Sequence, residues 1–152
     1  MLNEIIKGIA TALHTEFGNG YEIYQNDVEQ GLQEPCFFIA VLKPDLTRLP
    51  SGRYLATNPF DIHYFPRSMG DNTELCTAAE RMEECLEFIT LPSGVMLHGT
   101  GMSYQIVDDV LHLFINFDCI VTRSKTNDPM ETITIETDVK TMGGMEWQLE
   151  EE

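Results

Sequence analysis

The chain has 152 residues and carries nine Lys and Arg against 25 Asp and Glu, which gives a formal net charge of −16 at pH 7. Its length fits one domain whose core needs neither disulfides nor metal. The negative charge opposes adsorption to DNA, RNA or anionic lipid. The N-terminus has no signal-peptide pattern, and the longest apolar run, residues 36–42, is too short to cross a bilayer. We therefore expect a cytosolic protein that binds neither DNA nor membranes stably.

The cysteines and the known catalytic motifs give no sign of an enzyme. Four cysteines lie in apolar, periodic segments: Cys36, Cys76, Cys85 and Cys119. None forms a C-x-x-C pair, which favours buried free thiols over a disulfide framework or a zinc site. The chain has no P-loop, no G-x-G-x-x-G, H-E-x-x-H or G-x-S-x-G motif and no EF-hand loop.

The first half of the chain reads as a helix followed by strands. Apolar residues at helical spacing predict a helix over residues 2–17, which Gly18-Asn19-Gly20 stops. Four segments are predicted as strands: residues 21–24, 36–42, 53–57 and 60–65. Residues 36–42 are apolar on both alternating faces, which predicts a central strand covered by helices on one side and by a neighbouring subunit on the other. Residues 44–52 are expected to form a loop that carries Arg48.

Residues 71–89 have the best agreement between helical period, start signal and stop signal. Asp71 is an N-cap residue type with Glu74 at capping-box spacing, and Pro92-Gly94 follows the helix. The apolar stripe predicts packing on a sheet. Phe88 falls on the outer, polar side, near an acidic ridge of four residues: Glu80, Glu83, Glu84 and Glu87. Such a ridge is more often a solvated face, and we take the exposed Phe88 as an interface hypothesis.

Three strands and a polar tail are expected in the second half. The strands are predicted over residues 95–98, 102–107 and 110–122. Residues 123–152 carry three basic and eight acidic residues and are predicted to be an acidic C-terminal tail, disordered or ordered only in an assembly. Within the tail, residues 131–136 alternate well enough to add a strand to another chain, and Trp147 is a candidate anchor.

The order of these elements predicts the fold class. It indicates one α+β domain over residues 1–122, with a mixed or antiparallel sheet of about six strands and two helices packed on one face. The tail extends from this domain.

Polar residues on two predicted strands are the best candidates for chemistry. Asp61 and His63 lie on one strand, and His112 and Asp118 on another, so the four could meet if the strands are neighbours. Two imidazoles and two carboxylates can bind a metal or shuttle a proton. The same spacing more often marks the wetter face of a half-buried sheet. We therefore expect no catalytic residue, cofactor or metal ligand.

Residues 24–39 read YQNDVEQGLQEPCFFI and resemble the signature segment of the phage tail terminator family found in prophages. Three other stretches agree with that family: residues 64–66 at a strand end, residues 79–81 leading into Leu86, and the hairpin over residues 102–117. The resemblance covers about residues 2–122 and continues faintly to residue 131.

This resemblance implies a structural virion protein with an α+β fold. Tail terminators of long-tailed phages form a hexameric ring on the head-proximal end of the tail tube, stop its polymerisation and present the surface for head–tail joining. The expected partners are other copies of the chain, the tail tube protein and the head–tail connector protein. The expected locations are the host cytoplasm during assembly and the tail of the virion. The family has no catalytic residues, and the interface candidates here are Phe88, Arg48 and Trp147.

Two alternatives remain open from the sequence. A neck or head-completion protein of similar fold would share these features but would copurify with heads. A small metal-dependent enzyme using His63 and His112 would instead hold stoichiometric metal.

Overall fold

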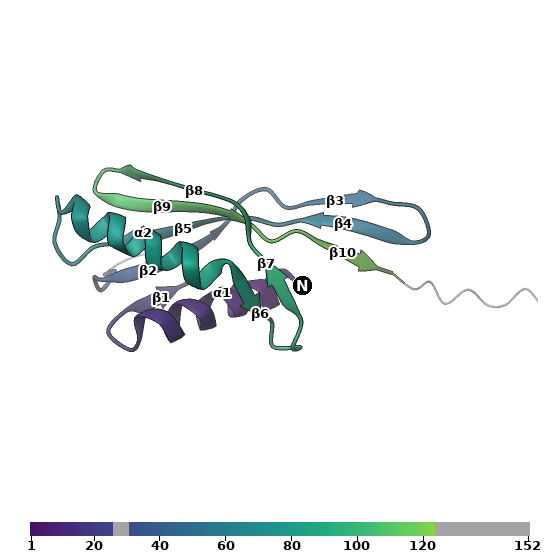
Figure 1. Cartoon of the computed structure of the whole chain (residues 1–152), viewed down its shortest axis with the longest axis horizontal. Coiled ribbons are helices and arrows are strands. Elements are labelled where there is room, and N and C mark those ends of the chain that lie inside the picture. Colours follow the sequence, from purple (N-terminus) through teal and green to yellow (C-terminus); the bar gives the residue numbers. More distant parts are fainter. Residues whose placement is uncertain (26–30, 124–152) are drawn as a thin grey trace, which may run out of the picture.

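The computed structural model describes residues 1–25 and 31–123, which form an α+β fold (Figure 1). The helices are α1 (Leu2–Phe17) and α2 (Asn72–Leu86). The strands are β1 (Glu22–Tyr24), β2 (Cys36–Val41), β3 (Asp45–Arg48), β4 (Arg53–Thr57), β5 (Pro59–Phe65), β6 (Phe88–Thr90), β7 (Met96–His98), β8 (Thr100–Val107), β9 (Val110–Asn116) and β10 (Cys119–Thr122). The predicted fold class is confirmed, whereas Trp147 and residues 131–136 lie outside the described residues. Neither described helix is long and apolar enough to cross a membrane.

The main sheet has five strands in the order β1-β2-β5-β9-β8. β5 occupies the centre and runs antiparallel to both neighbours, while β1 pairs parallel with β2, so the sheet is mixed. The strand predicted over residues 36–42 is β2, an interior strand that pairs with β1 and β5 and lies one place from the centre of the sheet. Within the described residues, both helices pack on the same face of this sheet. Cover of the other face by a neighbouring subunit therefore stays a prediction.

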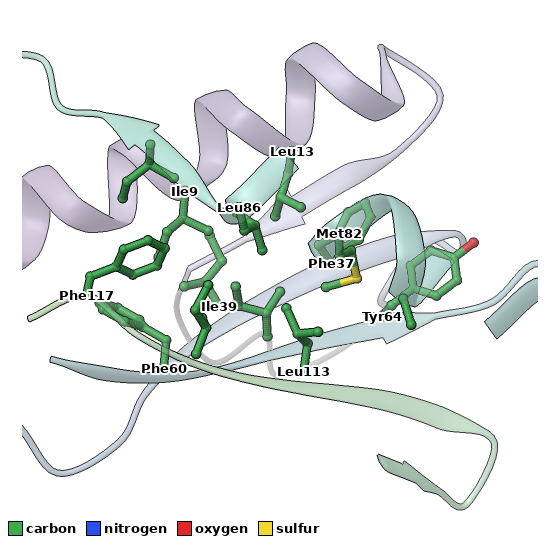
Figure 2. Close-up of a cluster of buried hydrophobic side chains, with 14 of the residues drawn as sticks. Ile9, Leu13, Phe37, Ile39, Phe60, Tyr64, Met82, Leu86, Leu113 and Phe117 are labelled. Carbon is green, nitrogen blue, oxygen red and sulfur yellow. The ribbon is translucent and has the colours of Figure 1, made fainter. Parts of the chain in front are cut away.

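The core fills the space between the helices and the main sheet, as Figure 2 shows. Alternate residues of the sheet strands meet the apolar stripes of both helices. The largest fully buried side chains include Ile5, Ile9, Leu13, Phe37, Ile39, Phe60, Ile62, Tyr64, Leu75, Met82, Leu86 and Phe117. Burying each aliphatic or aromatic side chain of this size stabilises the fold by about 1.5–3 kcal/mol. The apolar residues that recur every 3.6 residues in the helices and every second residue in the strands thus form one core.

The start of α2 is fixed by two carboxylates. Asp71 Oδ1 accepts hydrogen bonds from the backbone N–H groups of Thr73 and Glu74, at 3.0 and 3.3 Å. Glu74 does not complete a capping box. Its Oε1 accepts instead from the Tyr64 hydroxyl at 2.9 Å and from the Arg67 backbone N–H at 3.0 Å. Burial, and then the Glu74 carboxylate, raise the pKa of Tyr64, so this phenol stays a donor that ties α2 to the end of β5.

α2 ends at Leu86, earlier than predicted, and Phe88 belongs to strand β6 instead of the helix. β6 pairs antiparallel with β7, and the turn between them contains Pro92 and Gly94. These two residues therefore close a hairpin and do not stop the helix. The backbone N–H of Gly99 donates to the Glu87 carbonyl at 2.8 Å, which satisfies one of the carbonyls left free at the helix end.

β4 and β10 continue β5 and β9 past the helices and, with β3, form a three-stranded sheet that we call the extension (Figure 1). The pairing register is the same on both sides of the junction: Pro59 lies opposite Asn116 in the main sheet, and Ala56 lies opposite Cys119 in the extension. The prediction of a loop over residues 44–52 was wrong in part, because Arg48 is the last residue of β3 and pairs with β4.

Asn58 holds the junction between the main sheet and the extension. Its side chain is 2% exposed, and Nδ2 donates to the Phe117 carbonyl at 2.9 Å. Its backbone N–H donates to Asp118 Oδ1 at 3.2 Å, and its carbonyl accepts from the Phe117 N–H at 2.9 Å. At the point where β9 ends and β10 begins, these bonds take the place of the regular strand pairing. The single strand predicted over residues 110–122 is therefore two strands. Asn58 also separates β4 from β5.

Candidate functional site

Three polar side chains meet on the face of the main sheet that lies away from the helices. His63 Nε2 lies 2.9 Å from Asp61 Oδ2, and His112 Nδ1 lies 3.2 Å from the same oxygen. The register sets His63 directly opposite His112, with ring centroids 4.2 Å apart. The predicted meeting of the two strands is therefore confirmed for these three residues. Asp118 is not among them, because its carboxylate binds at the junction.

Aromatic rings surround this cluster of Asp61, His63 and His112. The Phe38 and Phe65 rings lie 5.6 and 6.4 Å from that of His63, between centroids. Asp61 Oδ1 is buried and has no hydrogen-bond partner among the described residues. The cluster thus places one carboxylate oxygen between two imidazole nitrogens and leaves the other oxygen unpaired, which is costly in a partly buried site.

The acidic ridge lies on the outer side of α2, as predicted. Glu80, Glu84 and Glu87 are exposed and Glu83 is half-buried, and none of the four forms an ion pair with a described residue. Arg81 on the same helix pairs with Glu16 of α1 at 3.1 Å. The ridge therefore consists of four carboxylates without an ion-pair partner among the described residues.

Phe88 is 54% exposed, and its ring stacks on that of His98 with centroids 4.8 Å apart. It borders a shallow groove of about 340 Å³, whose other wall is formed by small and polar residues of α1: Gly8, Thr11, Ala12, Thr15 and Glu16. The exposure expected from the sequence is observed, although the residue reaches the surface from a strand. Its role in an interface stays a hypothesis.

The extension exposes apolar residues that the sequence reading missed. Ile120 is 59% exposed and Leu46 is 40% exposed. Thr47, Leu55 and Ile120 lie opposite one another across the three strands, whereas Leu46 shares the other face with Ala56. The alternation of a strand could have revealed Ile120, because it places this residue on the opposite face from Cys119 and Val121. The extension therefore offers an apolar residue on each face.

Basic residues gather on and beside the extension, among them the interface candidate Arg48. They are Lys43, Arg48, Arg53 and Arg123, with Asp45 and Asp118 as the acidic residues of the same region. The rest of the described chain holds three basic and thirteen acidic residues. The extension region thus has a net positive charge, and the rest of the described chain has a net negative charge.

The four cysteines are free thiols, but they are not all buried as predicted. Cys36 is buried, Cys85 and Cys119 are half-buried, and Cys76 is exposed on α2. Burial raises the pKa of Cys36 to about 11 and that of Cys85 to about 12. Both thiols are therefore protonated at neutral pH and are poor nucleophiles.

One comparison with known proteins, the family model, agrees with the resemblance seen in the sequence. The family model described as phage tail terminator protein matches residues 4–129. Among curated proteins, none matches the chain. A solved chain titled as part of the virion of a native gene transfer agent particle superposes with a TM-score of 0.48 at 16% identity, over 80% of this chain and 96% of that one. Because the family match spans most of the sequence, the chain belongs to the phage tail terminator family and is a structural protein of the phage tail.

Proposed function

We propose that the chain forms a ring on the head-proximal end of the tail tube, stops tube polymerisation and provides the surface for head–tail joining, without catalysing a reaction. Its partners are then other copies of itself, the tail tube protein and the head–tail connector protein. It acts in the host cytoplasm during assembly and remains in the tail of the virion. Membership of the tail terminator family carries this proposal.

The extension supports self-association. A three-stranded sheet gains stability when an apolar face is covered, yet within the described residues no helix lies over the extension, and Ile120 and Leu46 remain exposed (Figure 1). A second copy of the chain could cover one of these faces. The apolar residues would then leave water on assembly, and each fully buried side chain of this size contributes about 1.5–3 kcal/mol.

Opposite charges favour a head-to-tail contact. The basic residues around the extension, such as Arg48, complement the acidic residues that predominate in the rest of the next copy. An interface between two different surfaces of one chain is heterologous, and it closes into a ring when the rotation between copies divides a full turn. A hexamer is one such closed ring. Phe88 and its groove are a second candidate surface for this contact.

The test of the proposed function is electron microscopy of the purified chain with polymerised tail tubes. We expect rings on one end of each tube and tubes that stop growing once capped. A tail terminator can stay monomeric until it meets the tube, so the chain alone is examined over a wide concentration range as well. If no ring forms under either condition, or if the chain copurifies with heads instead of tails, the proposal is wrong.

The acidic ridge gives a second prediction, which holds if the ridge lines the channel for DNA. The variant changes four residues together to Lys: Glu80, Glu83, Glu84 and Glu87. It should slow DNA ejection, because DNA phosphates that pass the channel wall would meet four new cations. The matching change to Gln removes repulsion without adding attraction, so we expect a smaller delay. Ejection is measured from purified virions by dye uptake of released DNA. Normal kinetics in the Lys variant, with tails of normal length, would place the ridge away from the channel.

A further inference from the structure

We propose that Asp61, His63 and His112 form a binding site for one divalent transition-metal cation of the Zn²⁺ class, on the face of the main sheet opposite the helices. The three residues offer two imidazole nitrogens and one carboxylate oxygen, and these ligand atoms lie within 4.8 Å of one another. This inference is independent of ring formation.

The distances in the cluster are close to those of a metal site. Zinc binds imidazole nitrogen and carboxylate oxygen at about 2.0–2.2 Å, so two ligands of a tetrahedral ion lie about 3.3–3.5 Å apart. His63 Nε2 and His112 Nδ1 lie 2.9 and 3.2 Å from Asp61 Oδ2. Since all three ligand atoms lie within 4.8 Å of one another, small movements of the side-chain ends would admit the ion. Three protein ligands leave a fourth position for water on the open side.

The backbone holds the ligands in place before any ion arrives. Asp61 and His63 point to the same side of β5 because they are two residues apart, and the register sets His112 of β9 directly across from His63. β5 and β9 are interior strands, each paired on both edges. A site on rigid, fully paired strands keeps its geometry better than one on a loop.

The unpaired oxygen of Asp61 is an independent sign of a missing partner. Oδ1 is buried and accepts no hydrogen bond from a described residue, while Oδ2 faces both imidazoles. A cation between the three side chains would neutralise this carboxylate and could take both of its oxygens. The rings of Phe38 and Phe65 near His63, and of Phe114 near His112, limit the water that would otherwise solvate the charge.

The ligand set selects the class of cation. Imidazole favours Zn²⁺, Ni²⁺, Co²⁺ and Cu²⁺, whereas Mg²⁺ and Ca²⁺ prefer sites built from oxygen. Binding also requires that His63 Nε2 and His112 Nδ1 present lone pairs, so any proton on these nitrogens must leave or move to the other ring nitrogen. Affinity for the cation should therefore fall at acidic pH.

The experiment is calorimetric titration of the chelator-treated full chain with ZnCl₂, with CoCl₂ as a probe whose visible absorption reports tetrahedral geometry. We expect one ion per chain, and an affinity at least about tenfold lower in Asp61→Asn and in the double variant His63→Ala/His112→Ala. The matched control is His14→Ala, an exposed imidazole on α1, which should bind as the unchanged chain does. Equal affinity in the site variants, or no binding to the unchanged chain, would overturn the proposal.

Nuclear magnetic resonance of the unchanged chain covers the case in which a variant fails to fold. Zinc should shift the ring ¹⁵N resonances of His63 and His112 and leave those of His14 and His98 in place. Shifts confined to His14 or His98 would show that zinc binds elsewhere and would equally overturn the site.

Discussion

Ile120→Asp is expected to abolish ring formation while the monomer remains folded. Ile120 is 59% exposed on β10, so the change buries no charge in the isolated chain. If Ile120 is a hot spot of the contact between copies, its loss costs about 2 kcal/mol or more, which corresponds to about 30-fold weaker association at each contact. The readouts are ring counts on tail tubes by electron microscopy and tail length in phage that carry the variant.

Met69→Asp is the matched control for this prediction. Met69 is 73% exposed in the segment between β5 and α2, which lies at the end of the molecule opposite the extension (Figure 1). The same change of an exposed apolar residue to Asp should there leave rings intact. Equal loss in both variants would point to a general effect of added charge. Rings of normal number with Ile120→Asp would remove the extension from the interface and leave Phe88→Asp as the next variant to test.

Gly99→Ala is expected to destabilise the fold by about 3 kcal/mol, since it overfills a closed space. A Cβ at position 99 would lie 2.5 Å from Ile115 Cδ1, 2.6 Å from the Leu86 carbonyl oxygen and 3.1 Å from Phe117 Cε1. The isoleucine end can rotate, but the carbonyl belongs to the backbone at the end of α2 and cannot move alone. Thermal unfolding should show a midpoint lower by roughly 10 °C.

Gly20→Ala is the control for this second prediction. The nearest atom to a Cβ at position 20 is Arg67 Nη2 at 3.5 Å, which is ordinary contact with the end of a flexible side chain. Its stability should therefore stay within about 0.5 kcal/mol of the unchanged chain. An unfolding midpoint of Gly99→Ala equal to that of Gly20→Ala would mean that the strand after β7 can shift to admit a methyl group.

Local patterns in the sequence predicted the elements better than their ends. The helical stripe of α2 was visible, but its stop was not, because Leu86 and Ile89 are both buried and three residues apart. That spacing suits a helix as well as a helix followed by a strand. The choice is made by pairing of β6 with β7, a contact between segments that no local period encodes.

The break between β9 and β10 was hidden for a similar reason. Alternation runs unbroken through Phe117 and Cys119, and the interruption depends on Asn58, which is distant in sequence. Arg48 was assigned to a loop because Pro44 and Gly52 flank its segment, although β3 needs only the free edge of β4.

The sequence predicted the candidate site only if two particular strands are neighbours in the sheet. Asp61 and His63 share a strand face by simple alternation, and the remaining question was whether the strand of His112 lies next to theirs. The strand order settles it, since β5 and β9 pair in a register that sets His63 opposite His112. Strand order depends on contacts between segments distant along the chain, so the local pattern of the sequence does not reveal it.

The common register of the main sheet and the extension has a mechanical consequence. A one-residue slip in β4 against β10 would have to pass through the Asn58 junction into β5 and β9, where it would turn Phe60 and Ile62 out of the core. The hydrophobic core therefore fixes the strand register of the extension, most of which lies outside that core. If copies meet through their extensions, the spacing between neighbours is set by the packing inside each subunit, and a cavity made in that core should loosen the assembly from a distance.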